Sequence, residues 1–172
     1  MAAAVRNRQR AVRVLSDAIS KCVDTALRAA LAKVAPQLPL AGADMPFEVS
    51  VMLVNDRVMR ALNRNYRAKD KTTDVLSFPQ FDDAPALVRA ARGASGSEQI
   101  LLGDVVISIA QALRQSTERK VPLSEELARL LIHGVLHLVG YDHERSNADA
   151  RVMQSLENAI LRRVGKEPLC SN

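Results

Sequence analysis

Apolar residues recur at helical spacing over five stretches of the chain. The first covers residues 14–35 and ends before Pro36, which predicts a long amphipathic helix because proline disfavours its continuation. The second covers residues 56–66 and follows Asn55, a residue type that caps helix N-termini. The C-terminal half shows the same period over residues 109–120, 123–140 and 147–165.

The helix expected over residues 123–140 has recognisable ends. Ser124 is a candidate N-cap, and Glu125 and Glu126 put negative charge in the first turn, where the helix dipole favours it. Gly140 stands where a left-handed cap would end the helix, because glycine tolerates a positive φ. The chain is therefore expected to reverse direction at Gly140.

Alternating apolar and β-branched residues predict strands over residues 46–54, 73–79 and 99–108. A short edge strand is compatible with the alternating arginines near the N-terminus, Arg6, Arg8, Arg10 and Arg13. Residues 82–98 are rich in Ala, Gly and Ser without a clear period, which predicts a surface loop. The order of these elements favours an α+β fold, in which a small mixed four-stranded sheet packs with about five helices in a single domain, residues 1–172.

Composition is compatible with one globular unit. The chain has 172 residues, of which 48% are hydrophobic and 25% charged, so it can bury a core and is not disordered by composition. Cys22 and Cys170 lie at opposite ends without paired spacing, which favours a reducing compartment and a cytoplasmic protein. No apolar run suggests a membrane span or a secretory signal, although the Arg- and Ala-rich start leaves an organellar transit peptide as an alternative.

The net charge of +5 and the pI of about 9.6 favour polyanionic partners such as nucleic acid. A modest basic excess is explained equally well by solubility.

All three histidines of the chain fall in one stretch, HGVLHLVGYDH, as His133, His137 and His143. The first two are four residues apart on an expected helix, so both side chains leave the same face. The turn expected at Gly140 carries His143 back toward them. Three neutral imidazoles in this arrangement suit one zinc ion and leave a fourth position for water.

Two structural interpretations compete with an open zinc site. Histidines on an apolar helix face can be core residues with satisfied hydrogen bonds. Alternatively, the zinc site can be closed and purely structural, with Cys170 or Asp142 as the fourth ligand. Asp142 also suits a role as an outer residue that orients one of the imidazoles.

The histidine spacing is the one that metzincin proteases use, but the general base of those enzymes is missing. Their first histidine is followed by a glutamate, whereas Gly134 stands at this position. Peptide hydrolysis also requires protonation of the leaving amine, and this stretch offers no group for it. A phosphodiester is the better substrate, because three neutral ligands leave zinc its full positive charge.

A basic stretch, LNRNYRAKDKTTDVLSFP over residues 62–79, supplies candidate RNA contacts. Its cations can bind phosphates, and Tyr66 can stack on a base. The four cations are Arg64, Arg67, Lys69 and Lys71. The alternative is a solvated basic turn without a binding role.

Three motifs together resemble the YbeY family of bacterial rRNA maturation factors: the basic stretch, LLGDVVIS, and the histidine stretch, in this order. The N-terminal VRNRQRAVRV also resembles that family, so the likeness covers most of the chain and weakens the transit-peptide alternative. Residues 82–98 depart from it, because the family usually has a shorter, proline-containing link before LLGD.

The resemblance implies a metal-dependent, single-strand-specific endoribonuclease that acts in 16S rRNA 3′-end maturation and ribosome quality control. It implies one zinc ion per chain, held by His133, His137 and His143, and a catalytic role for Arg67. The implied partners are single-stranded RNA of the 16S precursor and the small ribosomal subunit with its proteins, and no membrane.

Three hypotheses from different classes therefore stand side by side: a zinc ribonuclease, a zinc peptidase, and a non-catalytic ribosome-assembly factor with structural zinc. The missing glutamate argues against the peptidase. An open fourth zinc position would argue against the structural role.

Overall fold

The computed structural model describes residues 3–36, 38, 47–94, 99–142, 146–164 and 167–171. Its main sheet has four strands in the order β1 (Ala3–Asn7), β3 (Phe47–Val54), β5 (Ile100–Ser108) and β4 (Val75–Pro79). The first three are parallel to one another, and β4 runs antiparallel to β5. The expected α+β fold with a small mixed sheet is confirmed. An N-terminal strand does lie at the edge of the sheet, but it covers residues 3–7 and includes only Arg6 of the four arginines expected in it.

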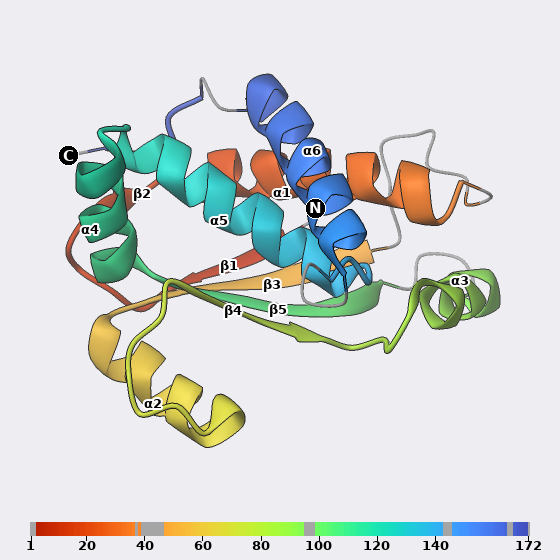
Figure 1. Cartoon of the computed structure of the whole chain (residues 1–172), viewed down its shortest axis with the longest axis horizontal. Coiled ribbons are helices and arrows are strands. Elements are labelled where there is room, and N and C mark those ends of the chain that lie inside the picture. Colours follow the sequence, from red (N-terminus) through yellow and green to blue (C-terminus); the bar gives the residue numbers. More distant parts are fainter. Residues whose placement is uncertain are drawn as a thin grey trace.

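Helices cover both faces of this sheet. Their bounds are α1 (Ser16–Val34), α2 (Asp56–Arg67), α3 (Ala84–Gly93), α4 (Ile109–Arg119), α5 (Leu123–Leu138) and α6 (Asn147–Val164). Figure 1 shows α1, α5 and α6 stacked on one side of the sheet and α2 alone on the other. No helix within the described ranges has both the length and the apolar character that a bilayer crossing would require.

Helix α5 lies at the centre of the core. It contacts α1, α4 and α6 as well as strands β4 and β5. Its apolar side chains are almost fully buried, among them Leu127, Leu130, Leu131, Ile132, Val135 and Leu136. A helix enclosed on so many sides is held firmly, and the side chains on its remaining face are therefore held in fixed positions.

The expected surface loop at residues 82–98 was wrong in its first part, because α3 occupies residues 84–93. The Asp83 carboxylate accepts a hydrogen bond from the Ala86 backbone N–H at 2.7 Å and so caps the helix, which has proline in its first turn. Leu87 and Val88 are buried against the core. With α3 included, the described part of the chain has six helices, where about five were expected. Residues 95–98 of the predicted loop lie outside the described part.

The proposed N-cap at Ser124 was also wrong. Pro122 occupies the N-cap position of α5. The Ser124 hydroxyl instead accepts a hydrogen bond from the Leu169 backbone N–H at 3.1 Å, which ties the C-terminal segment to the start of α5. That segment continues as β6 (Cys170–Ser171), which pairs antiparallel with β2 (Arg13–Val14) in a small second sheet that the sequence pattern does not reveal.

Candidate functional site

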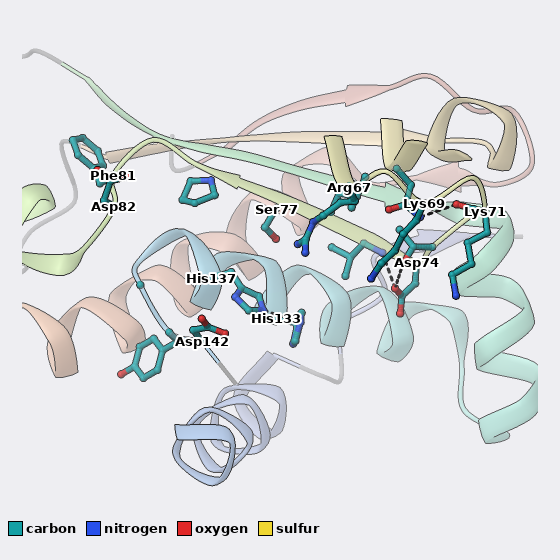
Figure 2. A pocket seen from close by; sticks show the side chains of 17 residues that line it. Arg67, Lys69, Lys71, Asp74, Ser77, Phe81, Asp82, His133, His137 and Asp142 are labelled. Carbon is teal, nitrogen blue, oxygen red and sulfur yellow. Dashed lines mark hydrogen bonds between the residues drawn. The ribbon is translucent and has the colours of Figure 1, made fainter. Parts of the chain in front are cut away.

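A cleft of about 620 Å³ opens between α5, the edge strand β4 and the segment that follows α2. Figure 2 shows His133 and His137 on α5, with Ser77 and Arg67 across the cleft from them. Lys69, Lys71 and Asp74 lie toward one end, and Phe81 and Asp82 toward the other. The cleft thus brings together residues from the histidine stretch and the basic stretch, which lie far apart in the sequence.

The two histidines point their ring nitrogens at one another. The Nε2 atoms of His133 and His137 are 3.1 Å apart, and the ring planes are inclined by 76°. On its other side, His133 Nδ1 lies 2.6 Å from a carboxylate oxygen of Glu157, in α6. When Nδ1 donates its proton to this carboxylate, neutral His133 carries no proton on Nε2, which is then available as a ligand.

This arrangement fits a zinc ion in its donor chemistry. Two imidazole ligands at about 2.0–2.1 Å from one tetrahedral ion would have their nitrogens about 3.3 Å apart, close to the 3.1 Å observed. The third expected ligand, His143, lies outside the described residues. Within the described ranges, no three His, Cys, Asp or Glu side chains gather as a metal-binding group. His133 and His137 are therefore the two described members of the expected set of three ligands.

The end of α5 turns the chain as expected at Gly140. The Gly140 N–H bonds to the His137 carbonyl and the Tyr141 N–H bonds to the Leu136 carbonyl, both at 3.1 Å. With φ of +96° at Gly140, these two bonds form a Schellman motif. The turn places Asp142 on the wall of the cleft, near His137.

Gly134 explains why the glutamate of the protease pattern is missing. A Cβ atom at this position would lie 2.6 Å from Val105 Cγ1 and 3.0 Å from Val105 Cγ2. The same Cβ would lie 3.3 Å from the hydroxyl of Ser77 on β4, so position 134 faces the sheet, and α5 packs too closely on β5 there for a side chain. A carboxylate base after the first histidine has no space in this fold.

The closed zinc site that includes Cys170 is excluded by position. The Cys170 sulfur lies 3.4 Å from the Ser124 hydroxyl, at the opposite end of α5 from the histidines. Ser124 and His133 are nine residues apart on one helix, which corresponds to about 13 Å along its axis. Asp142 remains compatible with both roles considered for it.

Specific contacts hold the backbone of the basic segment that follows α2. The buried Asn63 side chain donates a hydrogen bond from Nδ2 to the Lys71 carbonyl at 2.7 Å. Arg60 makes two hydrogen bonds to Asp70, at 2.8 and 2.9 Å. The exposed side chains of Arg67, Lys69 and Lys71 therefore start from a fixed backbone on the wall of the cleft.

Two predicted substrate contacts do not line the cleft. Tyr66 is 67% exposed, and its ring packs edge-on against the ring of Phe78, with 5.0 Å between the ring centroids. Phe78 belongs to the small apolar cluster between α2 and the sheet. Arg64 lies near Asp70: hydrogen bonds from Arg60 lower the pKa of that carboxyl, and the charge of Arg64 adds to the effect. Neither residue shares the space in front of the histidines.

Comparison with known proteins shows the family of this chain. A family model described as Endoribonuclease YbeY matches residues 4–165. The chain belongs to this family. An Endoribonuclease YbeY from Persephonella marina is 47% identical over 68% of this chain and 70% of its own length. Another from Aquifex aeolicus is 43% identical over 69% of this chain and 71% of its own length.

A solution structure of a protein from Thermotoga maritima matches 94% of this chain and 88% of its own chain, with a TM-score of 0.55 and 22% sequence identity. At that identity, the likeness concerns the fold alone. It agrees with a small mixed sheet covered by helices, the architecture expected of the YbeY family.

Several cleft residues of this YbeY family member were missed by the sequence reasoning. Phe81 and Tyr141 line the cleft as half-buried aromatic side chains, and burial raises the pKa of the Tyr141 hydroxyl. Asp74 and Ser77 line it from the segment leading into β4 and from β4 itself. Asp74 and Ser77 fall inside the basic stretch, but their polar side chains were not considered as part of a site. Phe81 and Tyr141 belong to no sequence pattern that predicts base stacking.

Asp74 is held in the ionised state. Burial raises the pKa of this carboxyl, but hydrogen bonds from the Gln115 side chain, the Val75 backbone N–H and the Thr73 hydroxyl outweigh burial, so the pKa lies below its usual range. Arg129 of α5 approaches it to 3.9 Å. These hydrogen bonds therefore favour the ionised form of Asp74.

Proposed function

We propose that this chain is a zinc-dependent endoribonuclease that cleaves single-stranded RNA. Endoribonuclease activity follows from its family. Our proposal adds that the activity requires zinc and is specific for single strands. The observation that carries the proposal is the shared cleft, in which the convergent imidazoles of His133 and His137 face the guanidinium of Arg67.

His133, His137 and His143 would hold one zinc ion per chain. The chemistry that zinc supplies in such a site is Lewis-acid polarisation of a phosphoryl oxygen. Glu157 lies beside His133 Nδ1, and the turn at Gly140 precedes the third histidine in the sequence. The two described imidazoles are neutral donors, so an anionic phosphodiester is drawn to the site rather than repelled by its ligands.

Arg67 binds the scissile phosphate. Its planar guanidinium can make two parallel charge-assisted hydrogen bonds to phosphate oxygens, and these strengthen as negative charge builds up during cleavage. Lys69 and Lys71 bind neighbouring phosphates at the same end of the cleft. The carboxylate of Asp74 lines the same end of the cleft and would repel a phosphate placed beside it.

Preference for single strands follows from the aromatic side chains in the cleft. Phe81 and Tyr141 can stack on a base only when that base is unpaired and turned out of a helix. Base stacking of this kind tolerates any sequence, so the position of the cut must be selected by the structure of the RNA around it.

We infer that the substrate is the 3′ end of the 16S rRNA precursor in the cytoplasm, presented by the small ribosomal subunit. Cleavage there would also serve ribosome quality control.

The proposal is tested by cleavage of a defined single-stranded RNA. Protein loaded with one zinc per chain is expected to cut it, and chelated protein is expected to lose the activity. His137→Ala should lose most of its zinc, because the remaining imidazoles no longer close the chelate. Arg67→Ala should keep its zinc but cut on the order of 10²–10³ times more slowly, as when other oxyanion donors are removed.

Arg67→Lys separates the guanidinium from mere positive charge. We expect only partial recovery in single-turnover cleavage, because a point charge cannot reproduce the planar fork. A rate within about twofold of wild type for Arg67→Ala would assign this residue to the solvated surface. Full zinc occupancy in His137→Ala would refute the metal site.

A further inference from the structure

Glu157 occupies an unexpected place on α6. The apolar positions of this helix form one stripe that packs on the core, made of Met153, Leu156, Ile160, Leu161 and Val164. Glu157 lies four residues after Met153 and three before Ile160, so helical spacing places it within this stripe. A carboxylate at a core-facing position requires a polar partner, because burying it without one is costly.

Its partner is the first histidine of the cleft. Glu157 Oε1 lies 2.6 Å from His133 Nδ1, and the two side chains are only 18% and 23% exposed. The contact joins α6 to α5 across 24 residues of sequence. Glu157 also acts on Arg129, which lies one turn before His133 on α5. Burial lowers the pKa of Arg129, but the hydrogen bonds and charge of Glu126 outweigh burial and raise the pKa above its usual range. The charges of Asp74 and Glu157 add to this increase.

The hydrogen bond selects one form of the His133 ring. A neutral imidazole carries its proton on one of two nitrogens, and the acceptor beside Nδ1 determines which. With the proton on Nδ1, the lone pair of Nε2 points at His137 Nε2, 3.1 Å away. With the proton on Nε2, the same ring could not bind a metal through that atom.

We propose that Glu157 is a positioning residue for the metal centre: it fixes the tautomer and orientation of His133, so that its Nε2 converges with that of His137. This role rests on the proposed function, because it acts through the zinc that those histidines would hold. It adds a third helix to the site, so that α6 contributes to metal affinity without contacting the ion or the RNA.

The test uses three variants of the full chain. Glu157→Met extends the apolar stripe, Glu157→Gln keeps a hydrogen-bond acceptor but removes the charge, and Glu118→Gln makes the same chemical change on an exposed position of α4. Zinc affinity is measured by competition with a chromophoric chelator. We expect affinity to fall on the order of 100-fold for Glu157→Met and tenfold for Glu157→Gln, and to be unchanged for Glu118→Gln.

Zinc affinity separates positioning from a merely structural role. Glu157→Met leaves the Nδ1–H of His133 without this acceptor, and removing one partner of a buried hydrogen bond destabilises a protein. Metal-free Glu157→Met is therefore expected to unfold at a lower temperature than metal-free wild type under either role. A merely structural role would leave the zinc affinity of the folded variant unchanged, whereas a positioning role lowers it.

A second readout needs no metal. The ¹⁵N chemical shifts of the His133 ring, recorded in metal-free protein at a pH where imidazoles are neutral, report which nitrogen holds the proton. Wild type should show the Nδ1–H form, and Glu157→Met should shift toward the Nε2–H form. The same tautomer in both proteins would overturn the proposal.

The outcomes distinguish this proposal from the proposed function. If His137→Ala loses zinc but both Glu157 variants bind it as wild type does, the positioning role is refuted and the metal site stands. If His137→Ala keeps its zinc, the metal site itself is refuted. Should Glu157→Met fail to fold, Glu157→Gln decides, and zinc affinity within twofold of wild type refutes the role.

Discussion

At the scale of single residues, Gly134 shows how packing decides the chemistry of the site. Its neighbour Val105 is buried in the central strand β5 and is β-branched, so its methyl groups cannot rotate out of the way. The Cβ of an alanine at 134 would lie 2.6 Å from one of these methyl groups. A glutamate at position 134 is therefore incompatible with how closely α5 and β5 approach.

We expect Gly134→Ala to lower the free energy of unfolding by about 1–3 kcal/mol, the usual cost of overpacking a core. The measurement is urea denaturation of the metal-free protein. Gly93→Ala is the matched control, because among the described residues no atom outside its own stretch of α3 lies within 4 Å of the Cβ that it would add. That variant should be as stable as wild type or gain up to about 1 kcal/mol. Equal stabilities for both variants would mean that α5 can move away from β5.

Residue spacing predicted the contacts within one helix and not those between elements. His133 and His137 converge as expected, because positions four apart share a helix face. Tyr66 adjoins Arg67 in sequence, yet consecutive helical residues point about 100° apart, so only Arg67 reaches the cleft. Glu157 reaches His133 from α6, a contact that residue spacing did not predict. The sequence signal for it was a charged residue within the apolar stripe of that helix.

At the scale of elements, the end of α2 carries the basic residues into the cleft. Asn63 is buried on this helix and bonds to the Lys71 carbonyl, while Ala68 ends the helix in a left-handed conformation with φ of +54°. Together they determine the path of the segment that presents Lys69 and Lys71. The buried amide of Asn63 therefore helps to order this segment, together with the Arg60–Asp70 hydrogen bonds.

Asn63→Ala should weaken RNA binding and slow cleavage while zinc content persists. The loss of a buried hydrogen bond, which leaves the Lys71 carbonyl without its partner, should cost about 1–3 kcal/mol of unfolding free energy. Asn65→Ala is the control, because Asn65 is exposed on the same helix. RNA affinity, cleavage rate and zinc content are measured for both. Equal RNA affinity in the two variants would show that the segment keeps its position without Asn63.

Helix and strand periods predicted most elements to within two residues of their observed ends, because each of these elements buries one face against the core. The helix α3 was missed, since only Leu87 and Val88 give it a buried face and its remaining residues are mostly alanine and arginine. The β2–β6 pair was missed for another reason. Strands of two residues have no period, and their pairing depends on where the chain ends meet.

At the scale of the whole molecule, positive charge is positioned by the fold rather than by the sequence alone. The net charge of +5 is modest, and sequence order groups Arg64, Arg67, Lys69 and Lys71 into one basic stretch. The fold divides this group, because three of these cations line the cleft and Arg64 does not. If RNA binds along the cleft, the three cations that line it should contribute to RNA affinity and Arg64 should not, although all four lie in one stretch of the sequence.

The salt dependence of RNA binding measures this distinction. Each phosphate neutralised on a single strand releases counterions and contributes about −0.7 to the slope of log affinity against log salt concentration. Lys69→Gln and Lys71→Gln should each make the slope less negative by about 0.7, and Arg64→Gln should leave it unchanged, because Arg64 lies outside the cleft. Fluorescence anisotropy of a labelled single-stranded RNA with metal-free protein gives the slope without cleavage. If Arg64→Gln changes it as much as the two lysine variants do, the RNA lies over the outer surface of α2, and the cleft is not its main binding site.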